Sequence, residues 1–134
     1  MTLEEIEQSL PNGLHDAQII RIGLDYVNRE VSLDMEIAWS NPDSDSEVWR
    51  SATLILTSFL YCIIEAPDPE YPFASRKGLL VDAGSEDPAS QSGTQLPEKL
   101  PEGAFKCWFY VNDWNSFIYL AALNAEITLH GEVQ

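Results

Sequence analysis

The chain has 134 residues, of which 22 are acidic and 7 are basic, giving a formal net charge of −15 and an isoelectric point near 4.1. This length fits a single domain, residues 1–134, with a core of ordinary size. The few Lys and Arg residues are scattered, which argues against nucleic-acid binding, and the acidic charge would repel an anionic membrane surface.

The sequence also predicts a cytoplasmic location. The N-terminus has no basic segment followed by an apolar one, and no apolar run approaches the ~20 residues that a membrane-spanning helix needs. Cys62 and Cys107 both lie in apolar segments, so we expect two buried free thiols, which would approach each other if their strands are neighbours.

A short helix is predicted over residues 2–10. Thr2 is a suitable N-cap, and Glu5, three residues later, completes a capping box. A Pro-Asn-Gly sequence at residues 11–13 then ends the helix. One apolar stripe would pack against a sheet: Leu3, Ile6 and Leu10.

From Gln18 to Trp39 apolar and polar residues alternate, which predicts an antiparallel hairpin with one face in the core. Residues 27–29 supply the turn. The core-facing positions are predicted to be Ile20, Ile22, Leu24 and Tyr26 on the first strand, and Val31, Leu33, Met35, Ile37 and Trp39 on the second.

The segment from Ala52 to Ile64 has no charged residue, and apolar side chains occupy both alternating sets of positions. This pattern predicts a central strand covered on both faces, with a buried helix as the alternative. A polar loop at Asn41–Glu47 leads into it. The acids of that loop do not fit a calcium-binding loop, because Val48 stands where glycine is required.

Residues 67–103 form a long irregular segment that holds six of the eight prolines. Only residues 79–81 (Leu-Leu-Val) have the composition of a short strand. A connection of this length in a compact domain is typically a binding or lid loop, or is disordered. We expect residues 84–95 to be the mobile part.

The C-terminal region has strong strand composition at Phe105–Val111, followed by a turn at residues 112–115. Ser116–Leu123 is either the second arm of a hairpin or a helix, and residues 125–130 form a final strand. The predicted fold class is α+β, mainly an antiparallel sheet arranged as a sandwich or open barrel, with one short N-terminal helix.

Common catalytic and metal-binding motifs are absent from the sequence. It contains no G-x-S-x-G, G-x-x-x-x-G-K, H-E-x-x-H or C-x-x-C pattern. We therefore predict no catalytic residue, no metal ligand and no cofactor.

Three polar groups remain as candidate ligand-binding residues. One precedes the first strand, one follows the central strand, and one surrounds a tryptophan that offers an aromatic face between amide and carboxylate groups. Each also has a structural explanation, because Asn and Asp are the residues that turns require. The candidates are His15, Asp16, Glu65, Asp68, Asn112, Asp113, Trp114 and Asn115.

Four blocks together resemble a family of small bacterial proteins of unknown function, and more loosely resemble immunity-type domains that begin with a Leu-His-Asp motif. They cover roughly half of the chain. The resemblance implies no activity and no catalytic residue. The blocks are Leu14-His15-Asp16-Ala17, Leu24-Asp25-Tyr26, residues 64–69 and residues 109–115.

The functional hypothesis is a non-enzymatic acidic binding module, for example an immunity-type inhibitor of a basic protein such as a toxin, which acts by charge complementarity. The alternative is a small enzyme or ligand-binding protein with a polar cleft near His15, Asp16, Glu65, Asp113 and Asn115. A structural or assembly subunit is a third class. The oligomeric state is left open by the sequence.

Overall fold

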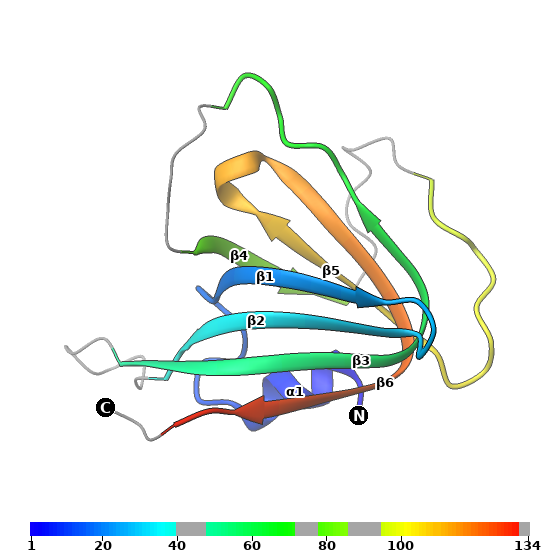
Figure 1. Cartoon of the computed structure of the whole chain (residues 1–134), viewed down its shortest axis with the longest axis horizontal. Helices are drawn as coiled ribbons and strands as arrows, with labels where there is room; N and C mark the ends of the chain where they lie inside the picture. The colour runs from blue at the N-terminus through cyan, green and yellow to red at the C-terminus, as the bar shows by residue number, and fades with distance from the viewer. Residues whose placement is uncertain (40–47, 72–77, 86–94, 132–134) are drawn as a thin grey trace.

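The structure is a computed structural model that describes residues 1–39, 48–71, 78–85 and 95–131. Within these residues six antiparallel strands form a closed barrel in the order β1-β2-β3-β6-β5-β4 (Figure 1). The elements are α1 (Leu3–Ser9), β1 (Gln18–Asp25), β2 (Glu30–Ala38), β3 (Trp49–Ile64), β4 (Leu79–Gly84), β5 (Phe105–Val111), the 3-10 helix η1 (Asn112–Trp114) and β6 (Ser116–Leu129).

The predicted class, α+β with a mainly antiparallel sheet and a short N-terminal helix, is confirmed. The sheet is closed, where a sandwich or an open barrel was expected. Closure depends on β4, which lies inside the predicted irregular segment at 67–103 and pairs with both β1 and β5. The loop at 41–47 and most of the segment at 84–95 lie outside the described residues.

The N-terminal helix forms as its sequence predicts. The Thr2 side chain accepts a hydrogen bond from the Glu5 backbone N–H at 3.2 Å, which caps the helix. Its apolar stripe is buried in the core, with Leu3 and Ile6 fully inaccessible. None of the helices in the described residues is long and apolar enough to cross a membrane.

The β1–β2 hairpin is confirmed, but a β-bulge after Ile19 changes which side chains of β1 face inward. Ile19 is buried, whereas Ile20 is 49% exposed and Tyr26 is 82% exposed in the turn, so the predicted core positions of these last two are wrong. Ile22 packs against the core, as predicted, whereas Leu24 lies opposite a buried residue of β2 but is 46% exposed, so its predicted core position is wrong.

Residues 52–64 are strand and not helix, but β3 is not fully covered on both faces. Ala52, Leu54 and Leu56 are buried, while the alternating positions are only half-buried. The strand that is buried on both faces is β6, over residues 118–122. Its inner face joins the barrel core, and its outer face joins an aromatic cluster: Trp108, Tyr110, Phe117 and Tyr119.

The β5–β6 hairpin is confirmed over the helical alternative for residues 116–123. β6 then continues through Asn124 to Leu129, so the separate final strand predicted at 125–130 is the second half of one strand. Between the two arms Asn115 adopts a left-handed conformation with φ of 47°, which Asn tolerates better than most residues.

The two cysteines are free, as predicted. Cys62 on β3 and Cys107 on β5 both lie opposite Leu120 of β6, one on each side, so β6 separates them. Burial raises the pKa of the Cys107 thiol to about 12. Both thiols face the core, although Cys62 is only partly buried.

The barrel has two corners at which neighbouring strands stop pairing. At the first, which we call the helix corner, β5 pairs with β6 only as far as Ala122, and residues 124–129 of β6 pair with β3 alone. The chain segment with α1 lies against this part of β6 (Figure 1), where the Ala125 N–H donates to the Met1 carbonyl at 2.7 Å. Apolar residues of this segment complete the core here.

At the second, which we call the pocket corner, β4 pairs with β1 only at Gln18 and Ile19. Beyond Thr57, β3 pairs with β6 and no longer with β2. The end of β3 and the second half of β1 therefore separate.

Candidate functional site

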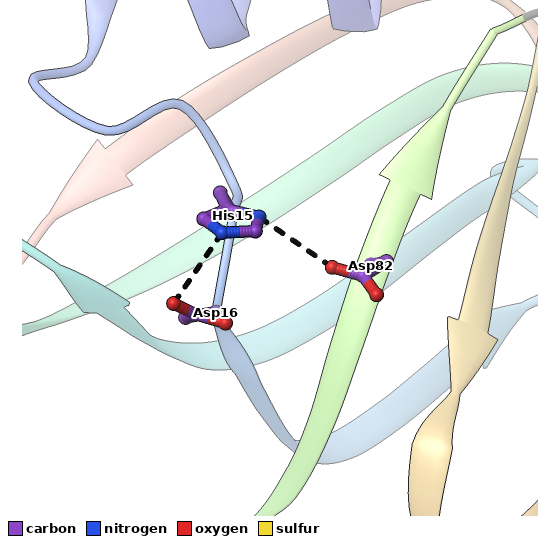
Figure 2. A group of neighbouring side chains, drawn as sticks. All are labelled: His15, Asp16 and Asp82. Carbon is purple, nitrogen blue, oxygen red and sulfur yellow. Dashed lines mark ion pairs between the residues drawn. The ribbon is translucent and has the colours of Figure 1, made fainter.

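Three side chains gather where the turn from α1 meets β4; we call them the His15 cluster. His15 and Asp16 come from the turn and Asp82 from β4 (Figure 2). The His15 Nε2 atom lies 3.5 Å from Asp16 Oδ2, and the Nδ1 atom lies 3.6 Å from Asp82 Oδ1. A backbone hydrogen bond holds β4 against the end of this turn, because the Val81 N–H donates to the Ala17 carbonyl at 2.9 Å.

Adjacent residues of an extended chain would point apart, but Asp16 has a positive φ of 59°, which bends the backbone and lets both side chains reach one site. The three side chains are 74%, 57% and 49% exposed. Each could offer one metal-ligand atom, and these atoms lie within 4.8 Å of one another. Both nitrogens of the imidazole already face a carboxylate (Figure 2), so the ring contacts both acids of the cluster.

A second group fastens the chain after β3 to the turn before β6; we call it the loop network. Asn115 Nδ2 donates to Asp68 Oδ2 at 3.0 Å, and the Tyr110 hydroxyl donates to Asn115 Oδ1 at 2.5 Å. The Asp68 N–H donates to the Trp114 carbonyl at 2.9 Å. Glu65 continues the pairing of β3 with β6, because its N–H donates to the Phe117 carbonyl at 3.0 Å, and its Oε1 atom accepts from the Phe117 N–H at 2.7 Å.

Hydrogen bonds set the ionisation of Asp68. The Glu70 backbone N–H and then the Asn115 amide both donate to its carboxylate, and they lower its pKa. A carboxylate held in this way stabilises a loop. It is poorly suited to accept a proton near neutral pH.

The structure thus places the predicted site residues in two neighbouring groups. Asp82 lies opposite Tyr110 in the β4–β5 ladder, so the His15 cluster and the loop network share the outer face of β4 and β5. Asn112 and Asp113 begin η1, and the Trp114 side chain packs against the core. Glu65 and Trp114 also line a cavity at the pocket corner.

This cavity, which we call the barrel-end pocket, has a volume of about 230 Å³ and a mainly apolar wall. Ser116 is the one buried polar residue in the described part of the chain, and it lines this pocket. The other lining residues are Ile19, Ile20, Arg21, Ile22, Ile64, Glu65, Leu79, Val111, Trp114 and Ile118.

Sequence reasoning missed Asp82 and Ser116. Asp82 follows the Leu-Leu-Val segment that predicts β4, so its outward direction could be inferred. Its contact with His15, across the seam between β1 and β4, could not be inferred. Ser116 is predicted as the first residue of the segment 116–123, and only the register that places it opposite Val111 shows that it faces the barrel interior.

Comparison of the chain with models of protein families, with curated proteins and with solved structures gives no match. The resemblance to small bacterial proteins and to immunity-type domains therefore stays a prediction.

Proposed function

We propose that this protein is a non-enzymatic binding module that recognises a basic protein through its acidic exterior, as an immunity-type inhibitor would. The observation that carries the proposal is the charge imbalance, with 22 acidic residues against 7 basic ones, on a barrel whose core is apolar. Such a charge accelerates encounter with a cationic partner and suppresses association with anionic ones.

The arginines of the described residues leave much of this charge uncompensated. Arg29 donates from Nη2 to the Phe59 carbonyl at 2.7 Å, and Arg50 donates to the Gly131 carbonyl at 3.1 Å. The Arg50 guanidinium also lies 4.9 Å from the centre of the Trp39 ring. Arg29 and Arg50 therefore bind backbone carbonyls and an aromatic ring, and these contacts do not neutralise a carboxylate.

The outer surface of the β2-β3-β6 wall carries four acidic residues, which we call the acidic face, three on β2 and one on β6 beyond the intervening β3: Glu30, Asp34, Glu36 and Glu126. These residues alternate with buried ones along the strands, so they share the outer side of the wall. Within this face Arg21 pairs with Asp34 at 3.0 Å, while Glu36 accepts a hydrogen bond from the neutral Ser51 hydroxyl at 2.7 Å. A cationic group of a partner could replace the neutral Ser51 hydroxyl as the hydrogen-bond donor to Glu36.

The experiment is to capture partners from an extract of the source cells, identify them, and measure association by stopped flow. The account expects a basic partner whose association rate falls at least ~10-fold between about 50 and 500 mM salt. The triple variant Glu30→Gln/Glu36→Gln/Glu126→Gln should associate more slowly at low salt. A partner bound equally well in high salt, or an acidic partner, contradicts the proposal.

A matched control removes the same charge elsewhere. Glu70→Gln/Glu98→Gln/Glu102→Gln changes three exposed loop residues and leaves the acidic face intact. It should reduce the rate less than the triple variant, because short-range complementarity adds to the long-range field. Equal effects of both variants would show that net charge acts without a defined face.

We also propose a cytoplasmic location. It is supported by the two unpaired thiols, because a reducing compartment keeps cysteines in this state.

A further inference from the structure

We propose that the barrel-end pocket binds a small, mainly apolar molecule that carries one uncharged hydrogen-bonding group, such as a bicyclic phenol or alcohol. This site goes beyond the proposed function, because it uses the interior of the barrel and not its acidic exterior. The two functions depend on different residues and can be tested separately.

The wall of the pocket is preformed by strands that are distant in sequence. Ile19 on β1, Val111 on β5 and Ile118 on β6 are each at least nine-tenths buried and belong to the core cluster. Leu79 and Trp114 pack against that cluster. Because the barrel fixes these positions, binding would order few additional side chains, which keeps its entropic cost low.

The size of the pocket limits its ligand. An apolar cavity of roughly 150 Å³ in another protein accommodates benzene. A cavity of about 230 Å³ would therefore hold a body the size of two fused rings. Larger lipids would have to leave most of their chain outside.

Ser116 supplies the polar contact. It lies opposite Val111 in the β5–β6 ladder, so its side chain faces the interior, and the residue is only 4% exposed. Ser116 also lines the pocket, so its hydroxyl is within reach of a bound molecule. A ligand carrying one donor or acceptor could form a hydrogen bond with this hydroxyl inside the pocket.

The negative charge of the protein disfavours an anionic ligand in the barrel-end pocket. Glu65 lies at the pocket, and the whole chain has a net charge of −15. Arg21 also borders the pocket, but its guanidinium is paired with Asp34 at 3.0 Å on the outer face of the barrel. A cationic group would gain from Glu65 but would lose its hydration in a mainly apolar wall, so the uncharged ligand is favoured.

The test uses one ring system with different polar groups: 2-naphthol, naphthalene, 2-naphthoate and 2-naphthylmethylamine. Binding is followed by NMR on the unmodified protein through the indole N–H signal of Trp114. The proposal expects saturable binding of 2-naphthol with a Kd on the order of 10–100 μM, and at least ~10-fold weaker binding of the carboxylate and the amine. Absence of saturable binding of 2-naphthol up to about 1 mM, or preference for either charged probe, overturns the proposal.

Two variants locate the site. Ile118→Trp should fill the pocket and weaken 2-naphthol binding at least ~10-fold, whereas Leu123→Trp, at a 44% exposed position of the same strand, should leave it unchanged. Ser116→Ala should weaken 2-naphthol roughly 3- to 10-fold and leave naphthalene unchanged. If both tryptophan variants bind like the unmodified protein, or if Ser116→Ala affects both probes equally, the assigned site is wrong.

Discussion

At both corners of the barrel a strand loses one of its two pairing partners, but the resulting gaps are filled differently. At the helix corner, residues 124–129 of β6 lose their β5 partner, and the segment containing α1 fills the space with buried side chains. At the pocket corner, the ends of β1 and β3 separate, and the short 3-10 helix η1 contributes only Trp114 to the wall of the gap. A cavity of about 230 Å³ remains, with Ile64 at its edge 51% exposed.

The helix corner is therefore expected to contribute mainly to stability, and the pocket corner to the proposed ligand binding. Side chains at the helix corner fill the interior, so their removal should leave voids that the rigid wall cannot close. At the edge of the pocket corner Ile64 is 51% exposed, so its truncation removes less buried surface. The space left at one corner is the reason that the fold has room for a ligand.

The largest predicted effect comes from truncating isoleucine at the two corners. Ile6→Ala at the fully buried helix corner should lower the free energy of unfolding by about 2–5 kcal/mol. Ile64→Ala should lower it by under about 1 kcal/mol, because this side chain is half exposed. Urea denaturation of both variants measures the difference, and equal losses would contradict the contrast between the corners.

The helix corner was largely predictable from sequence because its signals are local. The Thr2 cap, the stripe through Ile6 and the glycine at residue 13 lie within one short stretch. The β1–β2 hairpin was predictable for the same reason. The bulge after Ile19 was not, because strict alternation assumes an unbroken register, and a single inserted residue reverses which side chains face inward.

The pocket corner could not be derived from sequence because it joins β1, β3, β4, β5 and β6 over long separations. Glu65 and Trp114 were singled out for their chemistry, and their contact with one cavity depends on barrel closure. The His15–Asp82 contact depends on the same seam between β1 and β4. Only two residue pairs form that seam, which leaves no periodic signature in the sequence.

A smaller effect is predicted for the loop network that borders the pocket corner. Asn115→Gly keeps the positive φ but removes the amide that contacts Asp68 and Tyr110. Because Asn115 is exposed, the free energy of unfolding at neutral pH should fall by under about 1 kcal/mol. A loss as large as that of Ile6→Ala would show that this network, and not core filling, dominates stability.

The same variant has a defined pH dependence. The folded pKa of Asp68 is lowered from its reference value of 3.8, so its contribution to stability is present above that value and is lost as pH falls through the folded pKa. Asn115→Gly should raise the Asp68 pKa in part, since the bond from Glu70 remains. Carboxyl NMR titration measures this change, and the stability difference from the unmodified protein should shrink in acid.

The pocket corner, with Ile19 of β1 and Leu79 of β4 on one wall, requires that the barrel be closed between β1 and β4. The most direct measurement is a nuclear Overhauser experiment across this seam. The account predicts cross-strand contacts between Gln18 and Leu80 and between Ile19 and Leu79, together with slow exchange of the Val81 amide. An open sheet, with no contacts across the seam and rapid exchange of that amide, would contradict it.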